Sequence, residues 1–359
     1  MESIPFDEAR AEVFAENTLT MFNHGATALM VSIGHRTGLF DTMEQLPSST
    51  SHQIAEASGL NERYVREWLG AMTTAGITEY RRADDAYRLP PEHAAFLTRA
   101  SSPNNLAAFA QYFAVLGGVE DEVVEAFTTG AGVPYSSYNR FHEVMAEDSG
   151  QTVLPALKEH ILPLVPGLVE RMEASISVLD VGCGSGRALN LMAELFPRSR
   201  FTGYDFSDEA ISRGRAEAEA KDLGNVELSV RDAAEPFEDG AFDLITAFDA
   251  IHDQGRPAEV LRNIHAALKP GGTFLMQDIA GSSHVYNNLE HPAGPLLYAI
   301  SCMHCMSVSL AAGGPGLGAM WGKEKALEML GEAGFRDVRV EQLPHDFQNY
   351  YYIMHKQDV

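Results

Sequence analysis

Three glycines and a nearby acid form a segment well suited to binding a ligand. Gly182, Gly184 and Gly186 follow an apolar stretch in SVLDVGCGSGRAL, and Asp180 stands two residues before the first of them. Glycines let the backbone turn tightly and come close to a ligand at the N-terminus of the helix expected from Arg187. A dinucleotide-binding loop has the spacing G-x-G-x-x-G and holds a pyrophosphate. Here the spacing is G-x-G-x-G, and the carboxylate would repel a pyrophosphate but suits a cationic amine.

Further acids stand where the next two predicted strands end. Asp205 ends RFTGYD, with Phe206 beside it, and its carboxylate can accept hydrogen bonds from both hydroxyls of a ribose. Asp232 and Ala233 end the following strand, where a carboxylate can accept a hydrogen bond from an adenine amino group. Acids beside the glycine loop, and at positions suited to a ribose and to an adenine, favour a nucleoside ligand with a positively charged tail and no phosphate. S-adenosylmethionine fits this description.

The fourth strand ends in AFDAIHDQ, which supplies the candidate catalytic residues. Ligands of an open α/β sheet lie beyond the carboxyl ends of its strands, so we expect Phe248 and Asp249 to border the donor. His252 and Asp253 follow one turn later. A histidine titrates near neutral pH, where a general base is most useful. The other interpretation of His252 is a residue at a helix start, bonded to backbone.

The segment SCMHCMSVSL holds two cysteines three residues apart, Cys302 and Cys305. A zinc site needs four ligands, and His304 is expected on a different side of the helix, so we predict no metal site. Tyr298 is expected on the same side as the two cysteines. Packing or pocket lining is the preferred interpretation, with capture of a soft ligand and a redox pair as alternatives.

Strands and helices alternate from about residue 171 onwards, which indicates an α/β doubly wound sheet. Seven strands are expected, the last one antiparallel because only a short loop precedes it. Residues 20–100 predict short helices with a break at Gly38, then a helix-turn-helix capped at Thr50 or Ser51 and at Asn61, then a two-stranded wing. We therefore predict a winged-helix domain over 1–105 and a catalytic domain over 106–359, with a helical lid part over 106–170 and a Rossmann-like part over 171–359.

The motifs VLDVGCGSG, GYDFS, RDAAEPF and ALKPGG resemble those of class I S-adenosylmethionine-dependent methyltransferases. With the winged helix, the chain resembles dimerising small-molecule O-methyltransferases and mycobacterial-type winged-helix methyltransferases. RFHEVMAEDS is similar to a donor-covering F-x-x-x-M-x-x-x-S stretch, which implies pocket positions for Phe141, Met145 and Ser149, with His142 as a second candidate. Plant-type members carry the His-Asp dipeptide, but Gln254 stands here where they have tryptophan. The resemblance also implies that Tyr298, Cys302 and Cys305 line the acceptor pocket.

Charge and composition restrict the partners of the chain. The formal net charge is −24, and residues 51–100 hold six arginines against seven carboxylates. Such a surface repels phosphate backbones and anionic membranes, so we expect neither nucleic acid nor a membrane as a partner, and a dimerising role for the winged helix. The acidic N-terminus does not resemble a signal peptide, and three cysteines make no disulfide framework. A cytoplasmic location is expected.

These patterns favour an enzyme that moves a methyl group from S-adenosylmethionine to a small-molecule acceptor, most simply a hydroxyl, with His252 as base. Two alternatives stay open. One is a regulator that binds S-adenosylmethionine and DNA through the winged helix. The other is a thiol or metalloid methyltransferase that handles its acceptor with Cys302 and Cys305.

Overall fold

The computed structural model of the chain describes residues 5–344 and 346–357. It divides into two compact units, Met1–Val115 and Leu116–Val359. The domain limits expected at residues 105 and 106 stay a prediction.

The first unit is mainly helical. Its elements are α1 (Glu8–Thr37), α2 (Leu39–Gln45), α3 (Ser51–Ser58), α4 (Glu62–Thr74), β1 (Glu79–Arg81), β2 (Ala86–Arg88) and α5 (Pro91–Leu97). The caps form as predicted, because Thr50 and Gln53 make a reciprocal capping box and Asn61 accepts from the first turn of α4. The expectation of only short helices before Gly38 is wrong, because α1 begins at Glu8, where the Asp7 side chain caps it.

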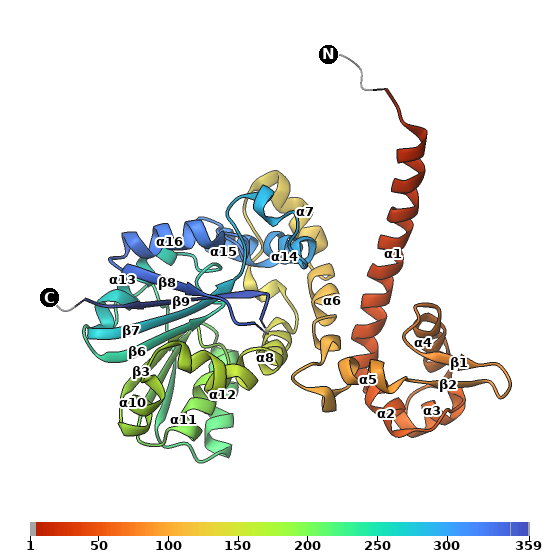
Figure 1. Ribbon diagram of the computed structural model, residues 1–359, viewed down its shortest axis with the longest axis horizontal. Helices are drawn as coiled ribbons and strands as arrows, with labels where there is room; N and C mark the ends of the chain where they lie inside the picture. The colour runs from red at the N-terminus through yellow and green to blue at the C-terminus, as the bar shows by residue number, and fades with distance from the viewer. Residues whose placement is uncertain (1–4, 345, 358–359) are drawn as a thin grey trace. The chain divides into compact units, whose positions relative to one another are not determined.

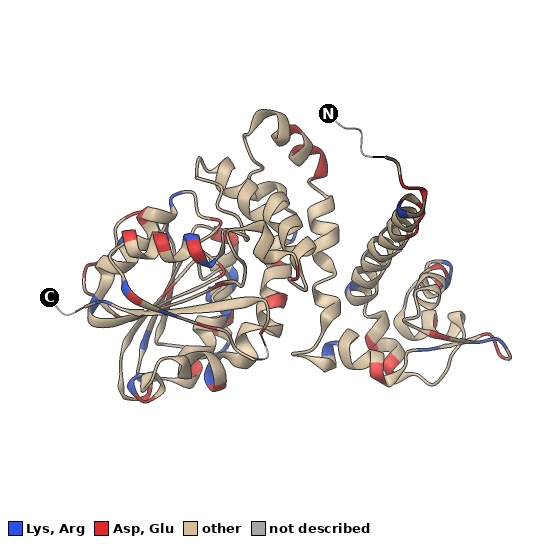
Figure 2. Ribbon diagram, turned by 45° about the horizontal axis from the view of Figure 1, so that its top comes forward, with Lys and Arg blue, Asp and Glu red and all other residues tan. Residues whose placement is uncertain are grey.

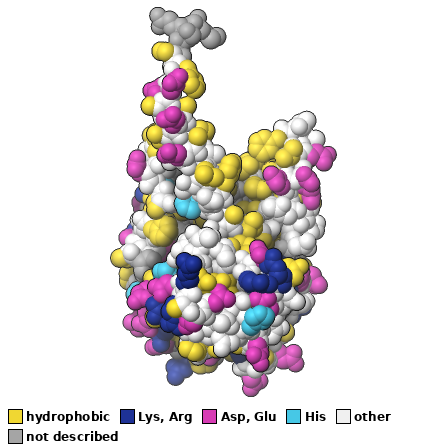
Figure 3. All heavy atoms as spheres, turned by 90° about the vertical axis from the view of Figure 1, so that its right-hand side faces the viewer, with side chains coloured by type: hydrophobic (Ala, Val, Ile, Leu, Met, Phe, Trp, Pro, Cys, Tyr) yellow, Lys and Arg dark blue, Asp and Glu magenta, His cyan; other side chains and the backbone are white. Residues whose placement is uncertain are grey.

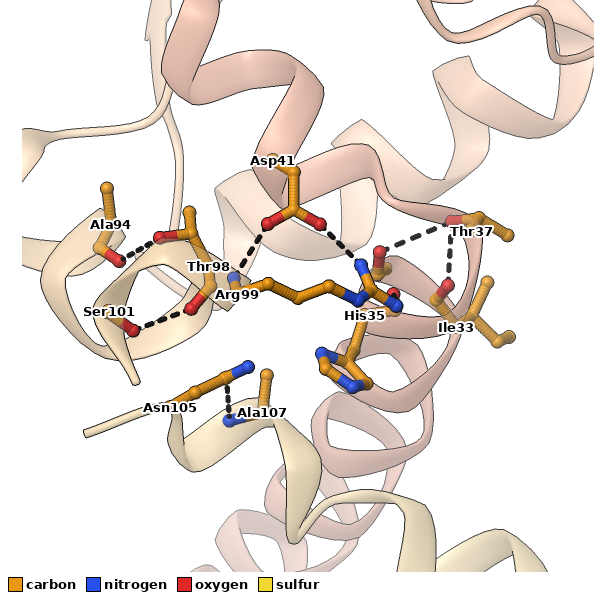
Figure 4. Close-up of polar contacts among 11 residues, drawn as sticks. Ile33, His35, Thr37, Asp41, Ala94, Thr98, Arg99, Ser101, Asn105 and Ala107 are labelled. Atoms are coloured by element: carbon orange, nitrogen blue, oxygen red, sulfur yellow. Dashed lines mark hydrogen bonds and ion pairs between the residues drawn. The ribbon is translucent and has the colours of Figure 1, made fainter. Parts of the chain in front are cut away.

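Arg99, which follows α5, forms hydrogen bonds with residues of α1 and α2. The backbone N–H of Arg99 donates to the Asp41 carboxylate (2.7 Å), and its guanidinium donates both to that carboxylate and to the carbonyl of His35 (Figure 4). A planar guanidinium can make several such bonds at once. The short turn after α5 is thereby fixed against the junction of α1 and α2.

The helix-turn-helix α3–α4 and the β1–β2 hairpin carry charges of both signs close together (Figure 2). Ion pairs join Arg63 to Glu67, Arg66 to Glu62, Arg81 to Asp84 and Arg88 to Glu79. Carboxylates therefore offset the arginines that a DNA backbone would need. The absence of a nucleic-acid partner stays a prediction.

The second unit begins with helices and continues as alternating strands and helices. A connecting helix, α6 (Gln111–Gly117), precedes it. Its helices are α7 (Glu120–Thr129), α8 (Phe141–Gln151), α9 (Val153–Ala156), α10 (Leu168–Ala174), α11 (Arg187–Leu195), α12 (Asp208–Ala220), α13 (Pro257–Ala267), α14 (Gly294–Ile300), α15 (Met306–Ala311) and α16 (Gly322–Glu332). Its strands are β3 (Ser177–Val181), β4 (Arg200–Asp205), β5 (Val226–Val230), β6 (Phe242–Phe248), β7 (Leu268–Ile279), β8 (Arg336–Glu341) and β9 (Asn349–His355).

The seven strands form one sheet in the order β5-β4-β3-β6-β7-β9-β8. β3, β4, β5, β6 and β7 are parallel to their neighbours in that series, and β9 is antiparallel to both β7 and β8. The predicted α/β fold with an antiparallel last strand is confirmed. The chain order reverses between β3 and β6, and ligands of such sheets bind at the carboxyl ends of the strands at this point.

Helices cover both faces of the sheet (Figure 1). Alternate residues of a strand point to opposite faces. On one face Leu179 and Ile245 belong to a core with α13 and α16, and on the other Val178 and Leu244 belong to a core with α9, α10 and α11. Burial on both faces holds the sheet rigid, so the loops at its carboxyl ends have fixed starting points.

The helical run Gly294–Ala311 is long and apolar enough, by length and composition, to cross a membrane. In this fold 44% of it is buried inside the protein, including Cys305 and Val308. It therefore packs as a core helix of the second unit.

Candidate active site

The glycine loop turns from β3 into α11 as the spacing predicts. Gly182, Gly184 and Gly186 all have positive φ, which glycine adopts at no steric cost. A Cβ on Gly182 would lie 2.4 Å from the Cβ of Ala250, so the loop and the end of β6 approach too closely for any side chain there. The three glycines thus hold two strand ends together around one space.

Asp205 connects this loop to the end of β4. One carboxylate oxygen accepts from the N–H of Gly184 (2.8 Å) and the other from the N–H of Ser207 (2.8 Å). A carboxylate oxygen has more than one acceptor position. Both oxygens can therefore also accept from a pair of vicinal hydroxyls.

A cavity of about 130 Å³ opens beside the loop. It brings together twelve of the side chains and glycines expected from the sequence: Phe141, His142, Met145, Ser149, Asp180, Gly182, Gly184, Asp205, Phe206, Phe248, Asp249 and Asp253. Gly186, Asp232, Ala233, His252, Tyr298, Cys302 and Cys305 do not line it.

Four buried or half-buried acids make the cavity suitable for a cation. Burial raises the pKa of Asp180 to about 7 and that of Asp253 to about 6. Burial also raises the pKa of Asp205, and burial together with Asp278 raises the pKa of Asp249 well above its usual range. A positive charge in the cavity would stabilise the ionised carboxylates and would itself be stabilised.

Asp232 lies beside a second cavity of about 360 Å³, which shares Phe206 and Asp253 with the first. Its carboxylate pairs with Arg256 (2.7 Å) and accepts from the N–H of Ala234 (2.8 Å). Burial raises the pKa of Asp232, but these bonds lower it more, so its pKa is below the usual range. Ala233 is buried behind this cavity.

Helix α8 covers the first cavity. His142 approaches the Ser207 hydroxyl (3.1 Å) and the Tyr135 hydroxyl (3.4 Å), and the Arg187 guanidinium donates to the carbonyl of Ala146. These bonds tie α8 to the ends of β4 and of the glycine loop. Burial lowers the pKa of His142.

His252 is buried and precedes Asp253, which lines the cavity. Its Nδ1 lies 2.8 Å from the Asp278 carboxylate, which also accepts from the indole N–H of Trp321 (3.0 Å). The Cys305 side chain also interacts with His252. Burial alone would lower the pKa of His252, but Asp278 and Cys305 together raise it well above its usual value.

Comparison with known protein families identifies a domain in each of the two units. Residues 25–99 match the Rv2258c-like winged HTH domain, and residues 172–334 match a methyltransferase domain. The chain combines a winged-helix domain with a class I methyltransferase domain. The methyl donor of this domain is S-adenosylmethionine, as the acids around the glycine loop predict.

Curated relatives match the methyltransferase domain over part of their length. The chain is 36% identical over 124 residues to demethylmenaquinone methyltransferase of Listeria welshimeri, which covers 33% of this chain and 52% of that protein. It is 31% identical over 199 residues to a highly reducing polyketide synthase of Emericella nidulans, which covers 52% of this chain and 8% of that protein. The chain thus spans about half or less of these relatives.

Solved structures resemble the chain over nearly its whole length. Human N-acetylserotonin methyltransferase, in complex with S-adenosylmethionine, has a TM-score of 0.69 at 16% identity and covers 99% of this chain and all of that one. Mitomycin 7-O-methyltransferase has a TM-score of 0.68 at 19% identity and covers 97% of this chain and 99% of that one. At these identities the likeness shows the shared fold.

The residues of the methyltransferase domain fit the donor. Gly182 leaves room where any Cβ would collide, and Asp205 keeps acceptor positions for ribose hydroxyls. Burial disfavours the ionised forms of Asp180 and Asp249, as their raised pKa values indicate. A donor with a sulfonium and an ammonium group would supply the missing positive charge.

The expectation that Tyr298, Cys302 and Cys305 share one side of a regular helix is wrong. Between α14 and α15 the residues Ser301–Cys305 form a π-helical turn, η7, which holds an extra residue and rotates the side chains beyond it around the helix axis. Cys302 lines a small pocket beside α7, with Phe127, whereas Cys305 contacts His252. Tyr298 accepts a hydrogen bond from Asn288 (2.9 Å). The two thiols therefore do not form one site in this structure.

Sequence reasoning missed four residues around the site. Asp278 is the last residue but one of β7, and Asp205 is the last residue of β4, so the same signal, an acid at a strand end, could have found Asp278. Tyr135 lines both cavities from a loop without a motif. Trp321 and His304 come close only because distant segments pack together.

Proposed function

We propose that the chain transfers the methyl group of S-adenosylmethionine to a hydroxyl of a small molecule, with His252 as the general base. The observation that carries this proposal is the buried pair of His252 and Asp278. The residue that follows His252 in the chain, Asp253, lines the cavity. A base beside the donor cavity is what a poorly ionised hydroxyl nucleophile requires.

The residues divide the work of the reaction. Bound S-adenosylmethionine supplies a methyl group on a positive sulfur, so alignment with the acceptor provides much of the rate. Asp180, Asp205 and the glycine loop hold the donor, and α8 excludes water. Asp278 fixes the ring of His252 and offsets the charge of the imidazolium that forms when the hydroxyl proton arrives.

Cys305 modifies this assignment, because its side chain also interacts with His252. The acceptor hydroxyl must reach Nε2, the ring nitrogen of His252 that does not face Asp278. Asp253 lines the cavity, has a pKa raised to about 6 by burial, and follows His252 as a second acid–base group.

The test is turnover of hydroxylated small molecules with S-adenosylmethionine, followed by release of S-adenosylhomocysteine. The substitution His252→Gln should lower kcat by roughly a hundredfold and leave calorimetric binding of the donor unchanged. Unchanged turnover of the variant would refute the role of His252. Absence of donor binding to the wild-type protein would refute the whole proposal.

We also propose that the winged-helix domain forms a homodimer in the cytoplasm. Apolar side chains along α1 are exposed to solvent, among them Phe14 (72%), Phe22 (63%), Leu29 (44%) and Ile33 (45%), and Figure 3 shows hydrophobic side chains along this helix. Exposed apolar side chains gathered on one helix are typical of a surface that another chain covers. Light scattering of the wild-type protein should give twice the chain mass, and the double variant Phe14→Glu, Phe22→Glu should be a monomer. A wild-type monomer would contradict the dimer proposal.

The proposed cytoplasmic location rests on a separate observation. The cysteines of the chain are free, which agrees with a reducing compartment.

A further inference from the structure

His304 is a buried histidine without a hydrogen-bond partner. It is 1% exposed, and within the described residues neither of its ring nitrogens has a partner. Burial, with His252 and His142 nearby, lowers its pKa to about 3, so the ring is neutral at physiological pH. A neutral imidazole has one N–H donor and one acceptor nitrogen. Leaving both unsatisfied destabilises the fold, and such groups in native proteins call for an explanation.

Aromatic rings surround His304 on the side of the donor cavity. The ring of Phe141 is stacked on it, with centroids 3.6 Å apart and planes at 9°. Tyr138 and Tyr135 meet it edge-on, at 4.7 Å and 5.3 Å between centroids. Phe141 and Tyr135 also line the cavity, so a single layer of rings separates His304 from the donor site.

The backbone of this segment is also unusual. His304 lies in the π-helical turn η7, and π-turns inside helices are frequent at functional sites. The next residue, Cys305, contacts the candidate base His252. The turn therefore presents one side chain to the base and its neighbour to the aromatic rings.

We propose that His304 recognises the methyl acceptor. A flat, uncharged acceptor takes the place of the Phe141 ring against the imidazole, and a polar group on its edge forms a hydrogen bond with a His304 nitrogen. This inference rests on the proposed function and names the class of acceptor: a planar conjugated molecule with a hydroxyl or similar group at its edge. An anionic acceptor is disfavoured, because His304 is neutral and the cavity carries Asp249 and Asp253.

His304→Phe tests the proposal, since it keeps a flat ring and removes both polar atoms. Differential scanning calorimetry of the variant should show a Tm higher by about 2–4 °C, because the unsatisfied atoms are gone. Binding of catechol, 1-naphthol and 8-hydroxyquinoline, measured by calorimetry with S-adenosylhomocysteine present, should weaken at least tenfold for those probes that bind the wild type. Donor binding should not change.

A second variant separates stacking from hydrogen bonding. Phe141→Leu removes the ring that competes for the slot, so the same probes should bind more tightly than to the wild type. A lower Tm for His304→Phe with unchanged probe binding would show a structural role, such as a bond to a buried water, and would overturn the proposal. Wild-type protein that binds none of the three probes would overturn it too. Because these readouts need no turnover, they stay separate from a failure of the methyl-transfer proposal.

Discussion

The donor edge of the sheet and the π-turn η7, for which we propose ligand-binding roles, are built in different ways. At the donor edge, Asp205 stands at the end of a strand, and backbone N–H groups from two loops satisfy its oxygens. In η7 three nearby side chains meet three different surroundings: Cys302 a pocket beside α7, His304 a set of aromatic rings, and Cys305 the base. The first site is built from local backbone geometry. The second site depends on the directions in which a π-helical turn points its side chains, and on contacts with residues far away in the sequence.

The largest effect should come from breaking the donor edge. Asp205→Asn removes the charge that accepts from the loop and from the ribose, and hydrogen bonds to charged groups are worth about 1.5–3 kcal/mol each. We expect affinity for S-adenosylmethionine to fall roughly a hundredfold in calorimetry. Asp208→Asn, on the exposed first turn of α12, is the matched control and should bind as the wild type does. Equal affinities of both variants would contradict the assigned role of Asp205.

The second largest effect concerns the candidate base His252. It is next in the chain to the cavity-lining Asp253, and its side chain interacts with Cys305 of η7. A general base must be unprotonated, and Asp278 raises the pKa of His252, so wild-type turnover should rise with pH through that raised value. Asp278→Asn removes the largest of the causes that raise this pKa, so the rise should begin at lower pH. The maximal kcat should fall by roughly 10- to 100-fold because the ring loses its orientation. The measurement is the pH dependence of kcat. A profile of unchanged position would show that Asp278 does not set the pKa of His252.

The same pair should make stability depend on pH. The folded-state pKa of His252 lies above its unfolded value of about 6.5, so its stabilising contribution is complete below that pH and is lost as pH rises through the folded value. The difference in unfolding free energy between wild type and His252→Gln should therefore be larger at acidic than at alkaline pH. Urea unfolding at several pH values measures it. A constant difference would mean that the pKa of His252 is the same folded and unfolded.

The smallest effect should distinguish the two thiols of η7. Cys305→Ser keeps a hydrogen-bonding group beside His252 and should change KM for the acceptor by no more than about tenfold, about 1.4 kcal/mol. Cys302→Ser, three residues earlier in a different pocket, should leave KM and kcat unchanged. A loss of turnover in both variants would revive the alternative in which the thiols act together on the acceptor.

The donor side could be predicted from the sequence because its signals are short-range. Gly182, Gly184 and Asp205 hold their positions through strand and helix geometry within a few residues, and the structure brings them to one cavity. The prediction that Tyr298, Cys302 and Cys305 share one helical face was wrong because of one local feature, the π-helical turn η7. Nothing in the pattern of residues 294–311 distinguishes a regular helix from one with a π-turn, because both bury apolar side chains all round.

The sequence by itself determined the fold class, the donor and most of the residues that line the cavity beside the glycine loop, since periodicity, glycine spacing and acids at strand ends express local backbone rules. Only the tertiary structure decided that Asp278 and Cys305 flank His252, and that Phe141 stacks on His304. Those contacts join β7, η7, α8 and the loop after β6, which are far apart along the chain. Their geometry follows from packing of the whole domain and from one extra residue in a helical turn.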